Sequence, residues 1–321
     1  VENSFVHPYM PNSVTENKKA MLDELGINSV EDIYKSIIPD ELLYKERLDI
    51  PEPIRSEYEL KRHVMGILNR DITTEEYTSF LGAGCYKHQV PAICDEINSR
   101  GEFLTAYCGD TYSDHGKMQA IFEYTSMMGE LLDTDVVSYT TYDGGQAVAS
   151  SLRMAVRAVR EKGMAGKVIL VPKTMNPEIY SQVVQYCRNV AEVRKIAYEP
   201  ETGLMDLEEL KEQLAKKNVA AVFFENPTYL GNFETRGEEI AKLAHDAGAY
   251  CVVQTEVAAL GIMESPVNQG ADIVCGDIQP LGMHIQFGGG QAGFIACNQN
   301  MDLVEQFPTY MYGITETEKE D

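Results

Sequence analysis

Basic residues are scarce in this chain of 321 residues. Lysine and arginine together number 27, against 50 aspartates and glutamates, which gives a formal net charge of −23 at pH 7. Nucleic acids and anionic membranes both bind to basic faces, so we expect neither of them as a partner. The acidic surface is interpreted mainly as a source of solubility, with the steering of a basic partner as the alternative.

Paired cysteines and long apolar runs are also missing. The seven cysteines are scattered, and no two of them have the C-x-x-C spacing. An odd, dispersed set is typical of reduced thiols, and it argues against a disulfide framework and against a structural metal site. No apolar run approaches the roughly 18 residues of a membrane span. The composition therefore predicts a soluble, cytoplasmic protein.

The first seventy residues differ in composition from the rest and are rich in Glu, Lys, Pro and Asn. Ile50-Pro51-Glu52-Pro53 forces an extended segment, because proline fixes φ and restricts the residue before it. We expect an N-terminal helical arm over residues 1–70, laid over a partner or over the main domain, since it is too thin to have its own core. Its expected helices are Thr15–Leu25, which stops at Gly26, then 30–37 and 56–69.

Residues 71–321 are expected to form one large α/β domain. Apolar segments of strand length alternate there with segments of helical periodicity, and the run 219–224 is apolar throughout. This alternation predicts a mostly parallel sheet with right-handed crossovers and helices on both faces. The expected strands are 167–171, 193–197, 219–224, 250–253, 271–275 and 293–296, and the expected helices are 117–131, 146–162, 177–188, 206–217 and 234–247.

Polar side chains follow several of these strands. In parallel sheets, ligands bind beyond the carboxyl ends of the strands. A site is therefore expected at that edge, and the residues at or just after the expected strand ends are Asn226, Gln254, Glu256, Asp277 and Gln279.

The turn Asp143-Gly144-Gly145 opens a long helix. Small residues allow the free amides at a helix start to point at an anion, so the turn is a candidate phosphate cradle. A purely structural turn is the alternative. The Walker pattern G-x-x-x-x-G-K-[ST] is absent, so the sequence does not predict a P-loop.

Two loops are dense in tyrosine, aspartate and histidine, a composition that is common in substrate or interface loops. One is the glycine-rich segment 80–88, and the other is the polar segment 105–116, directly before a helix. For each histidine, an ordinary hydrogen-bonded role is the alternative. The candidate contacts to substrate or to a partner's site are Tyr86, His88, Thr105, Tyr107, Asp114 and His115.

Lysine is missing where the surrounding pattern leads one to seek it. No lysine lies between Lys242 and Lys319, a gap of 76 residues (318 − 242). In a pyridoxal-phosphate enzyme a glycine turn holds the phosphate, an acid at a strand end faces the pyridine nitrogen, and a lysine about twenty residues later forms the Schiff base. Glu256 fits the acid, although a capping or interface role is equally open. Without the lysine, the chemistry must lie partly on another chain.

Several motifs in order carry a resemblance over nearly the whole chain. They are Pro8-Tyr9-Met10-Pro11-Asn12, Phe80-Leu81-Gly82-Ala83-Gly84-Cys85-Tyr86, Gln119-Ala120-Ile121-Phe122-Glu123-Tyr124, Tyr142-Asp143-Gly144, Gly270-Ala271-Asp272-Ile273-Val274 and Phe287-Gly288-Gly289. The chain resembles subunit 1 of glycine dehydrogenase (decarboxylating), the alpha subunit of the split P-protein of the glycine cleavage system.

The resemblance implies a pyridoxal-phosphate-dependent transferase-like fold of type I that lacks the Schiff-base lysine. It implies a heterotetramer in which a catalytic beta subunit carries pyridoxal phosphate, so that no catalytic residue lies within this chain alone. The implied reaction decarboxylates glycine and passes the aminomethyl group to a lipoyl carrier protein. Gln279 or Pro280 then lies near the lost lysine position, and Glu256 lies where the family has Asp. The implied vestigial cofactor pocket consists of Asp143, Gly144, Gly145, Glu256, Gln279 and His284.

Two departures from the family pattern stand out. The family loop T-P-Y-Q-x-E-x-S-Q-G corresponds here to residues 105–116, where His115 replaces the glutamine and the proline is lost. Family members also continue into a small C-terminal domain, so this chain is expected to be partial or divergent. The alternatives are a subunit of a related complex acting on a different amino acid, and a non-catalytic scaffold or regulatory subunit.

Overall fold

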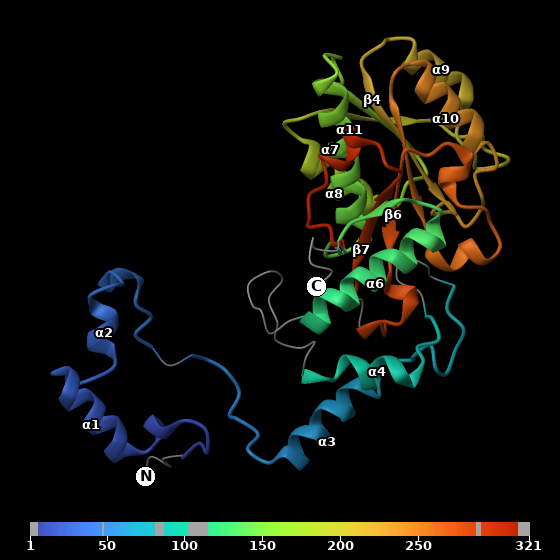
Figure 1. The fold of residues 1–321 in the computed structure, drawn as a ribbon. Helices are drawn as coiled ribbons and strands as arrows, with labels where there is room; N and C mark the ends of the chain where they lie inside the picture. Colours follow the sequence, from blue (N-terminus) through green and yellow to red (C-terminus); the bar gives the residue numbers. More distant parts are fainter. Residues whose placement is uncertain (1–5, 47, 81–86, 102–114, 287–289, 314–321) are drawn as a thin grey trace, which may run out of the picture. The chain divides into compact units, whose positions relative to one another are not determined.

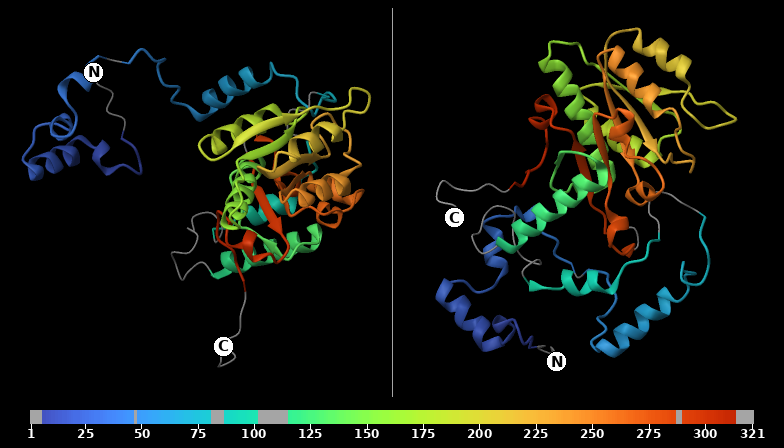
Figure 2. Two further views of the ribbon diagram at one scale, coloured as in Figure 1. Left: turned by 90° about the horizontal axis from the view of Figure 1, so that it is seen from above. Right: turned by 45° about the vertical axis from the view of Figure 1, so that its right-hand side comes forward.

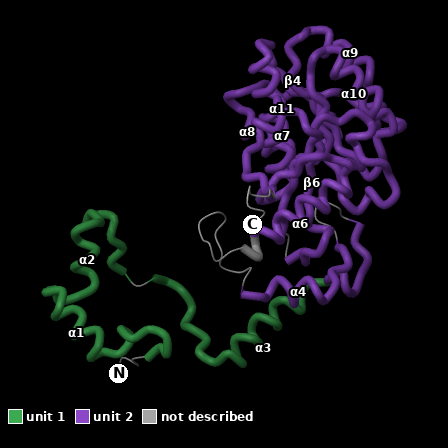
Figure 3. The backbone as a smooth tube through the Cα atoms, viewed as in Figure 1, with its two compact units in different colours: residues 1–72 green, residues 73–321 purple. Residues whose placement is uncertain are grey.

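A computed structural model describes residues 6–46, 48–80, 87–101, 115–286 and 290–313 of the chain (Figure 1). The chain divides into two compact units, residues 1–72 and residues 73–321 (Figure 3). Within the described ranges, no helix is long and apolar enough to cross a membrane.

The first unit consists of short helices without a core. Ser56 caps the last of them, because its hydroxyl accepts the N–H of Glu59, and Gly26 ends the first in the left-handed conformation at φ 66°. None of the described residues of this unit is buried. Its helices are α1 (Thr15–Leu25), α2 (Glu31–Lys35) and α3 (Glu57–Leu68).

The second unit contains a seven-stranded sheet in the order β1-β7-β6-β5-β4-β2-β3. Five neighbouring strands, β6, β5, β4, β2 and β3, run parallel, whereas β7 is antiparallel to both β6 and β1. The prediction of a mostly parallel sheet is therefore confirmed. The strands are β1 (Val136–Val137), β2 (Val168–Pro172), β3 (Glu192–Ile196), β4 (Val219–Asn226), β5 (Tyr250–Thr255), β6 (Ile273–Asp277) and β7 (Gly293–Cys297).

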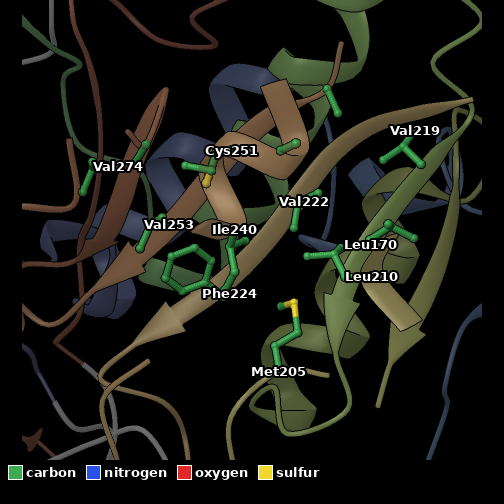
Figure 4. Close-up of a cluster of buried hydrophobic side chains, with 14 of the residues drawn as sticks. Leu170, Met205, Leu210, Val219, Val222, Phe224, Ile240, Cys251, Val253 and Val274 are labelled. Carbon is green, nitrogen blue, oxygen red and sulfur yellow. The ribbon is translucent and has the colours of Figure 1, made fainter. Parts of the chain in front are cut away.

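Helices cover both faces of the sheet (Figures 1 and 2), as expected from a central strand such as β4, which is buried along its whole length. Side chains alternate along β4: Val222 and Phe224 pack with α9 and α10 on one face (Figure 4), and Ala221 and Phe223 pack with α7 on the other. The helices of this unit are α4 (Ala92–Asn98), α6 (His115–Leu132), α7 (Gly144–Glu161), α8 (Pro177–Cys187), α9 (Leu207–Leu214), α10 (Gly237–Asp246) and α11 (Met301–Val304).

Some helices and strands begin or end at other residues than the sequence predicts, because helix capping and strand pairing set these boundaries. α7 begins at Gly144, because the Asp143 carboxylate accepts the N–H of Gln146 and so caps the helix ahead of both glycines. β4 and β5 each run two residues further than predicted, since Glu225 and Asn226 pair with Gln254 and Thr255. The short elements α4 and β1 were not predicted, because neither is long enough to show a periodicity.

The packing of α10 on the sheet gives a test of this core. Ile240 on α10 is fully buried, and Ile262 is 83% exposed. We expect Ile240→Ala to lower the free energy of unfolding by about 2–5 kcal/mol, because it leaves a cavity between helix and sheet. The matched variant Ile262→Ala should change it by less than about 0.5 kcal/mol. Urea unfolding measures both, and equal losses would contradict the assigned core.

Candidate functional site

A cleft of about 580 Å³ lies at the carboxyl edge of the parallel strands. Its walls come from the start of α7, the ends of β4, β5 and β6, and the loops that follow β2 and β4. This is the edge at which the sequence predicts a site. Its lining residues include Asp143, Gly144, Gly145, Asn176, Glu178, Gln182, Glu225, Tyr229, Gln254, Glu256 and Asp277.

The amide end of α7 is closed by the chain's own side chains. The N–H of Gly144 donates to Asp277 Oδ2 at 2.9 Å, and the N–H of Gln146 donates to Asp143 Oδ1 at 2.6 Å. At Gly145, a Cβ atom would meet Gln182 Oε1 at 2.5 Å, so the Gln182 side chain covers this turn. Two carboxylates therefore occupy the place at which a helix start receives a bound anion.

Asp277 joins three segments at the floor of the cleft. Its carboxylate accepts backbone N–H groups from Gly144, from Gln279 at 2.7 Å and from Ala292. Burial raises the pKa of this carboxyl, and the three N–H groups oppose the rise while the charge of Asp143 adds to it. The carboxylate thus holds the end of β6 against the start of α7.

Glu225 is the most deeply buried acid of the cleft, with 5% of its surface exposed. Its carboxylate accepts the N–H of Asn176, at the start of α8, at 3.1 Å, and the N–H of Tyr229 at 3.2 Å. Burial raises the pKa of Glu225 to about 7, although the two N–H groups lower it. A carboxyl with such a pKa can gain or lose a proton near neutral pH.

Glu256 directly follows β5 and accepts the N–H of Ala258 at 3.1 Å, so it acts as a cap of the following helical turn. Burial raises the pKa of Glu256, the Ala258 N–H and the charge of His88 lower it, and the charge of Asp277 raises it. His88 therefore lies within electrostatic reach of the cleft. Its Nε2 is buried and has no hydrogen-bond partner among the residues that the structure describes.

Four residues of the expected cofactor pocket line this cleft: Asp143, Gly144, Gly145 and Glu256. The other two lie outside its lining. Gln279 turns away, because its side-chain amide donates to the carbonyl of Met283 at 2.6 Å, and His284 is exposed and contacts Asp95 at 3.1 Å. In the loops, Tyr86, Thr105, Tyr107 and Asp114, and the side chain of His115, lie outside the described residues.

Two further cleft residues, Glu225 and Asn176, were not predicted from the sequence. The expected strand stopped at Phe224, one residue before Glu225, but β4 continues to Asn226 and places Glu225 at the edge of the cleft. Asn176 caps α8 with its side chain, which accepts the N–H of Glu178. An asparagine before Pro177 at a helix start is the signal that could have located it.

The sheet order, with one antiparallel strand beside five parallel ones, and the cleft at the carboxyl edge define the class: a fold type I, pyridoxal-phosphate-dependent transferase-like protein. Residues 7–321 match the family of the glycine cleavage system P-protein. The chain belongs to the glycine cleavage system P-protein family. The resemblance stated from its motifs is thereby confirmed.

Individual relatives agree with this assignment. The chain is 35% and 38% identical to the proteins named probable glycine dehydrogenase (decarboxylating) subunit 1 of Staphylothermus marinus and Pyrococcus horikoshii, over 96% of its own length. It spans 66% of the length of each of these relatives. A crystal structure of glycine decarboxylase (P-protein) in inhibitor-bound form superposes with a TM-score of 0.80 at 31% identity, covering 98% of this chain and 67% of that one. Sphingosine-1-phosphate lyase of Burkholderia pseudomallei, at 13% identity and a TM-score of 0.58, shares the fold; 84% of this chain and 64% of that chain are covered.

The described cleft residues do not fit pyridoxal phosphate, on which this class depends. The phosphate would need the amides of Gly144 and Gln146, which already donate to carboxylates. Five acids line the cleft, and no lysine or arginine is among its described lining residues. Nor do the described residues contain a group of three or more His, Cys, Asp or Glu that could hold a metal ion. A cofactor with a dianionic phosphate is thus opposed by charge and has no amine to bind. The five acids are Asp143, Glu178, Glu225, Glu256 and Asp277.

The raised pKa of Glu225 predicts a pH dependence of stability. Its pKa rises from 4.5 to about 7 on folding, so the folded state binds the proton more tightly than the unfolded state. The free energy of unfolding should therefore fall as the pH rises from about 4.5 to about 7, by about 3 kcal/mol in total. Glu225→Gln should remove this fall, as measured by urea unfolding across that range. Glu178→Gln, which removes an exposed acid of the same cleft, is the control, and an unchanged slope in Glu225→Gln would contradict the assignment.

The three N–H groups on Asp277 predict a stability loss at this position. Asp277→Ala leaves the amides of Gly144, Gln279 and Ala292 without their acceptor, so we expect the free energy of unfolding to fall by about 3 kcal/mol. Asp277→Asn retains one acceptor oxygen, and its loss should be about 1 kcal/mol. Thermal and urea unfolding compare the two variants. Equal values for both would show that the carboxylate oxygens do not join these segments.

Proposed function

We propose that this chain is the subunit of a pyridoxal-phosphate-dependent glycine decarboxylase that lacks the cofactor-binding lysine. Together with a catalytic second subunit, it would convert glycine and a lipoyl carrier protein into aminomethyl carrier protein and carbon dioxide. Family membership supports the proposal, and so do the relatives named subunit 1, a name that implies a second subunit.

One observation supports the proposal that the cofactor is bound by the second subunit and not by this chain. The cleft is of the fold type I kind, yet carboxylates fill its phosphate position and no lysine or arginine is among its described lining residues. Such a cleft cannot hold the cofactor by charge or by covalent attachment. Pyridoxal phosphate is therefore proposed to be carried by the partner subunit, where it supplies the electron sink for loss of the glycine carboxylate.

The loop residues Tyr86, Thr105, Tyr107, Asp114 and His115 are proposed to contact the partner's site or its substrate. His88 belongs to the same proposal, because its charge acts on the carboxyl of Glu256 at the wall of the cleft. In this role the side chains would orient groups and exclude water, and the partner would perform the covalent chemistry.

The N-terminal arm, residues 1–70, is proposed to pack on the partner subunit or on the large α/β domain, residues 71–321. Its exposed apolar side chains support this, since Leu25 is 63% exposed, Ile37 72% and Ile50 67%, and an isolated chain would leave them in water. The assembly is proposed to be a heterotetramer in the cytoplasm, with no membrane or nucleic acid partner. The net charge of −23 supports the last point.

Co-expression with the second subunit of the same genome tests the proposal. The purified complex should contain pyridoxal phosphate and exchange labelled bicarbonate with the carboxyl group of glycine, whereas this chain alone should do neither. Activity of the isolated chain would contradict the proposal. Activity of the complex with another amino acid but not with glycine would assign a related reaction instead.

Variants of this chain, measured in the complex, show whether its side chains contribute to the reaction or whether it is only a scaffold. We expect Glu256→Gln and His88→Asn to lower the exchange rate by about tenfold, because Glu256 lines the cleft and the charge of His88 acts on its carboxyl. Glu212→Gln makes the same chemical change as Glu256→Gln at an exposed position of α9 and should leave the rate unchanged. Equal rates in all three variants would favour a non-catalytic scaffold.

A further inference from the structure

A second hollow, of about 590 Å³, lies between the carboxyl-terminal halves of α7 and α8, and its character is opposite to that of the cleft. It is lined by Arg153, Gln185, Tyr186, Arg188, Asn189 and Val190, with no acid among these residues. Arg153 lies more than two helical turns after Gly144, roughly 14 Å along the axis of α7. The hollow shares no lining residue with the acid-lined cleft, although on α8 its residue Gln185 lies one turn after Gln182 of the cleft.

The arginines around this hollow lack carboxylate partners in an acidic protein. No carboxylate of the described residues lies within 4.0 Å of Arg153, Arg160 or Arg188, whereas Arg194 and Arg236 are both paired with glutamates. Most described arginines share this state, including Arg55, Arg62, Arg70, Arg100 and Arg157, so an unpaired guanidinium is not itself unusual in this chain. The hollow is distinguished because two such arginines line it together and no acid is among its lining residues.

Part of this arrangement has a structural explanation. Arg153 Nη1 donates to the carbonyl of Tyr186 at 3.2 Å, and Arg160 donates to the carbonyl of Val190, so both satisfy carbonyls at the end of α8. Each guanidinium has five N–H donors, however, and most remain available. Arg188 has no hydrogen-bond or ion-pair partner among the described residues, so the capping of α8 does not account for it.

The positive charge of Arg153 affects the pKa values of two neighbouring groups. The pKa of Arg157, one turn after Arg153 on α7, is lowered by burial and then by the positive charge of Arg153. Burial raises the pKa of the Cys187 thiol to about 11, but the charge of Arg153 opposes that rise. The charge of Arg153 therefore reaches both neighbouring groups, while the charge of Glu161 opposes its effect on Arg157.

The composition of the rim favours a protein partner. Arginine and tyrosine are enriched at protein interfaces, and Tyr186 and Val184 beside the hollow are 37% and 38% exposed. A second copy of this chain would bring the same arginines against one another if it met this face symmetrically. The guanidinium fork matches carboxylates in geometry and charge.

We propose that the hollow bounded by Arg153 and Arg188 is a docking site for an acidic segment of another protein, whose carboxylates pair with these two guanidinium groups. No acid is among the lining residues of the hollow, and at physiological ionic strength the repulsion from acids farther away than about 8 Å is screened. The site therefore also gives an acidic partner a preferred orientation. This inference does not depend on the proposed decarboxylase function.

Binding of a fluorescein-labelled hexaglutamate peptide to the full chain, followed by fluorescence anisotropy, tests the site. At about 10 mM ionic strength we expect saturable binding that weakens strongly at about 150 mM. The double variant R153Q/R188Q should bind about tenfold more weakly. R55Q/R70Q removes the same charge from exposed positions of the arm and should bind like the unmodified chain.

Two further measurements complete the test. R188Q changes an exposed side chain that has no hydrogen bond or ion pair with the described residues, so the fold should be unaffected, and circular dichroism of the variant checks this. Labelled hexalysine should bind equally to all variants. Absence of saturable hexaglutamate binding, or equal binding by R188Q and the unmodified chain, would overturn the proposal. Displacement of the peptide by an equal concentration of inorganic phosphate would also overturn it, in favour of a small-anion site.

Discussion

The carboxylate of Asp277 is the interaction on which the architecture of the cleft depends. It accepts N–H groups from the start of α7, from the turn after β6 and from Ala292 ahead of β7. Charge-assisted hydrogen bonds of this kind are stronger than neutral ones, so three separate segments are held at one point. Since one of these N–H groups is the first of α7, the same carboxylate takes the place that an external anion needs. The hydrogen bond from Gly144 to Asp277 thus both holds the cleft together and blocks phosphate from the start of α7.

The two ends of α7 differ in the sign of the charged side chains around them. Carboxylates gather at its amide end, and unpaired arginines gather towards its carboxyl end. From Gly237 to Asp321 the chain contains no arginine, and its lysines there are Lys242 and Lys319. Because the ends of β5 and β6 come from this stretch, they bring no positive charge to the cleft. A cofactor-bearing partner at one end and an acidic partner at the other are both consistent with this polarity.

Long elements were predictable because their periodicities are strong. The helix 146–162 and the strand 219–224 were expected close to α7 and β4, and Asp143, Gly144, Gly145 and Glu256 were expected at the site that the cleft now defines. Glu225 was not predicted, because the expected strand ended at Phe224, whereas two more residues of strand pairing place Glu225 at the cleft. Gln279 and His284 follow the end of β6 in sequence, but a tight turn takes both side chains away from the cleft lining. Turn geometry of this kind depends on local hydrogen bonds that hydrophobic patterning does not encode.

By itself, the sequence determined the alternation of strands and helices, the acidic character of the surface and the missing lysine, because composition and periodicity are properties of the chain read in order. The strand order, with its single antiparallel member beside β6, was decided only by the tertiary structure. So were the contact of Gly144 with Asp277 and the clustering of unpaired arginines beside the end of α8. These contacts join residues far apart along the chain, and their energies come from burial and from hydrogen bonds that exist only once the sheet has brought those segments together.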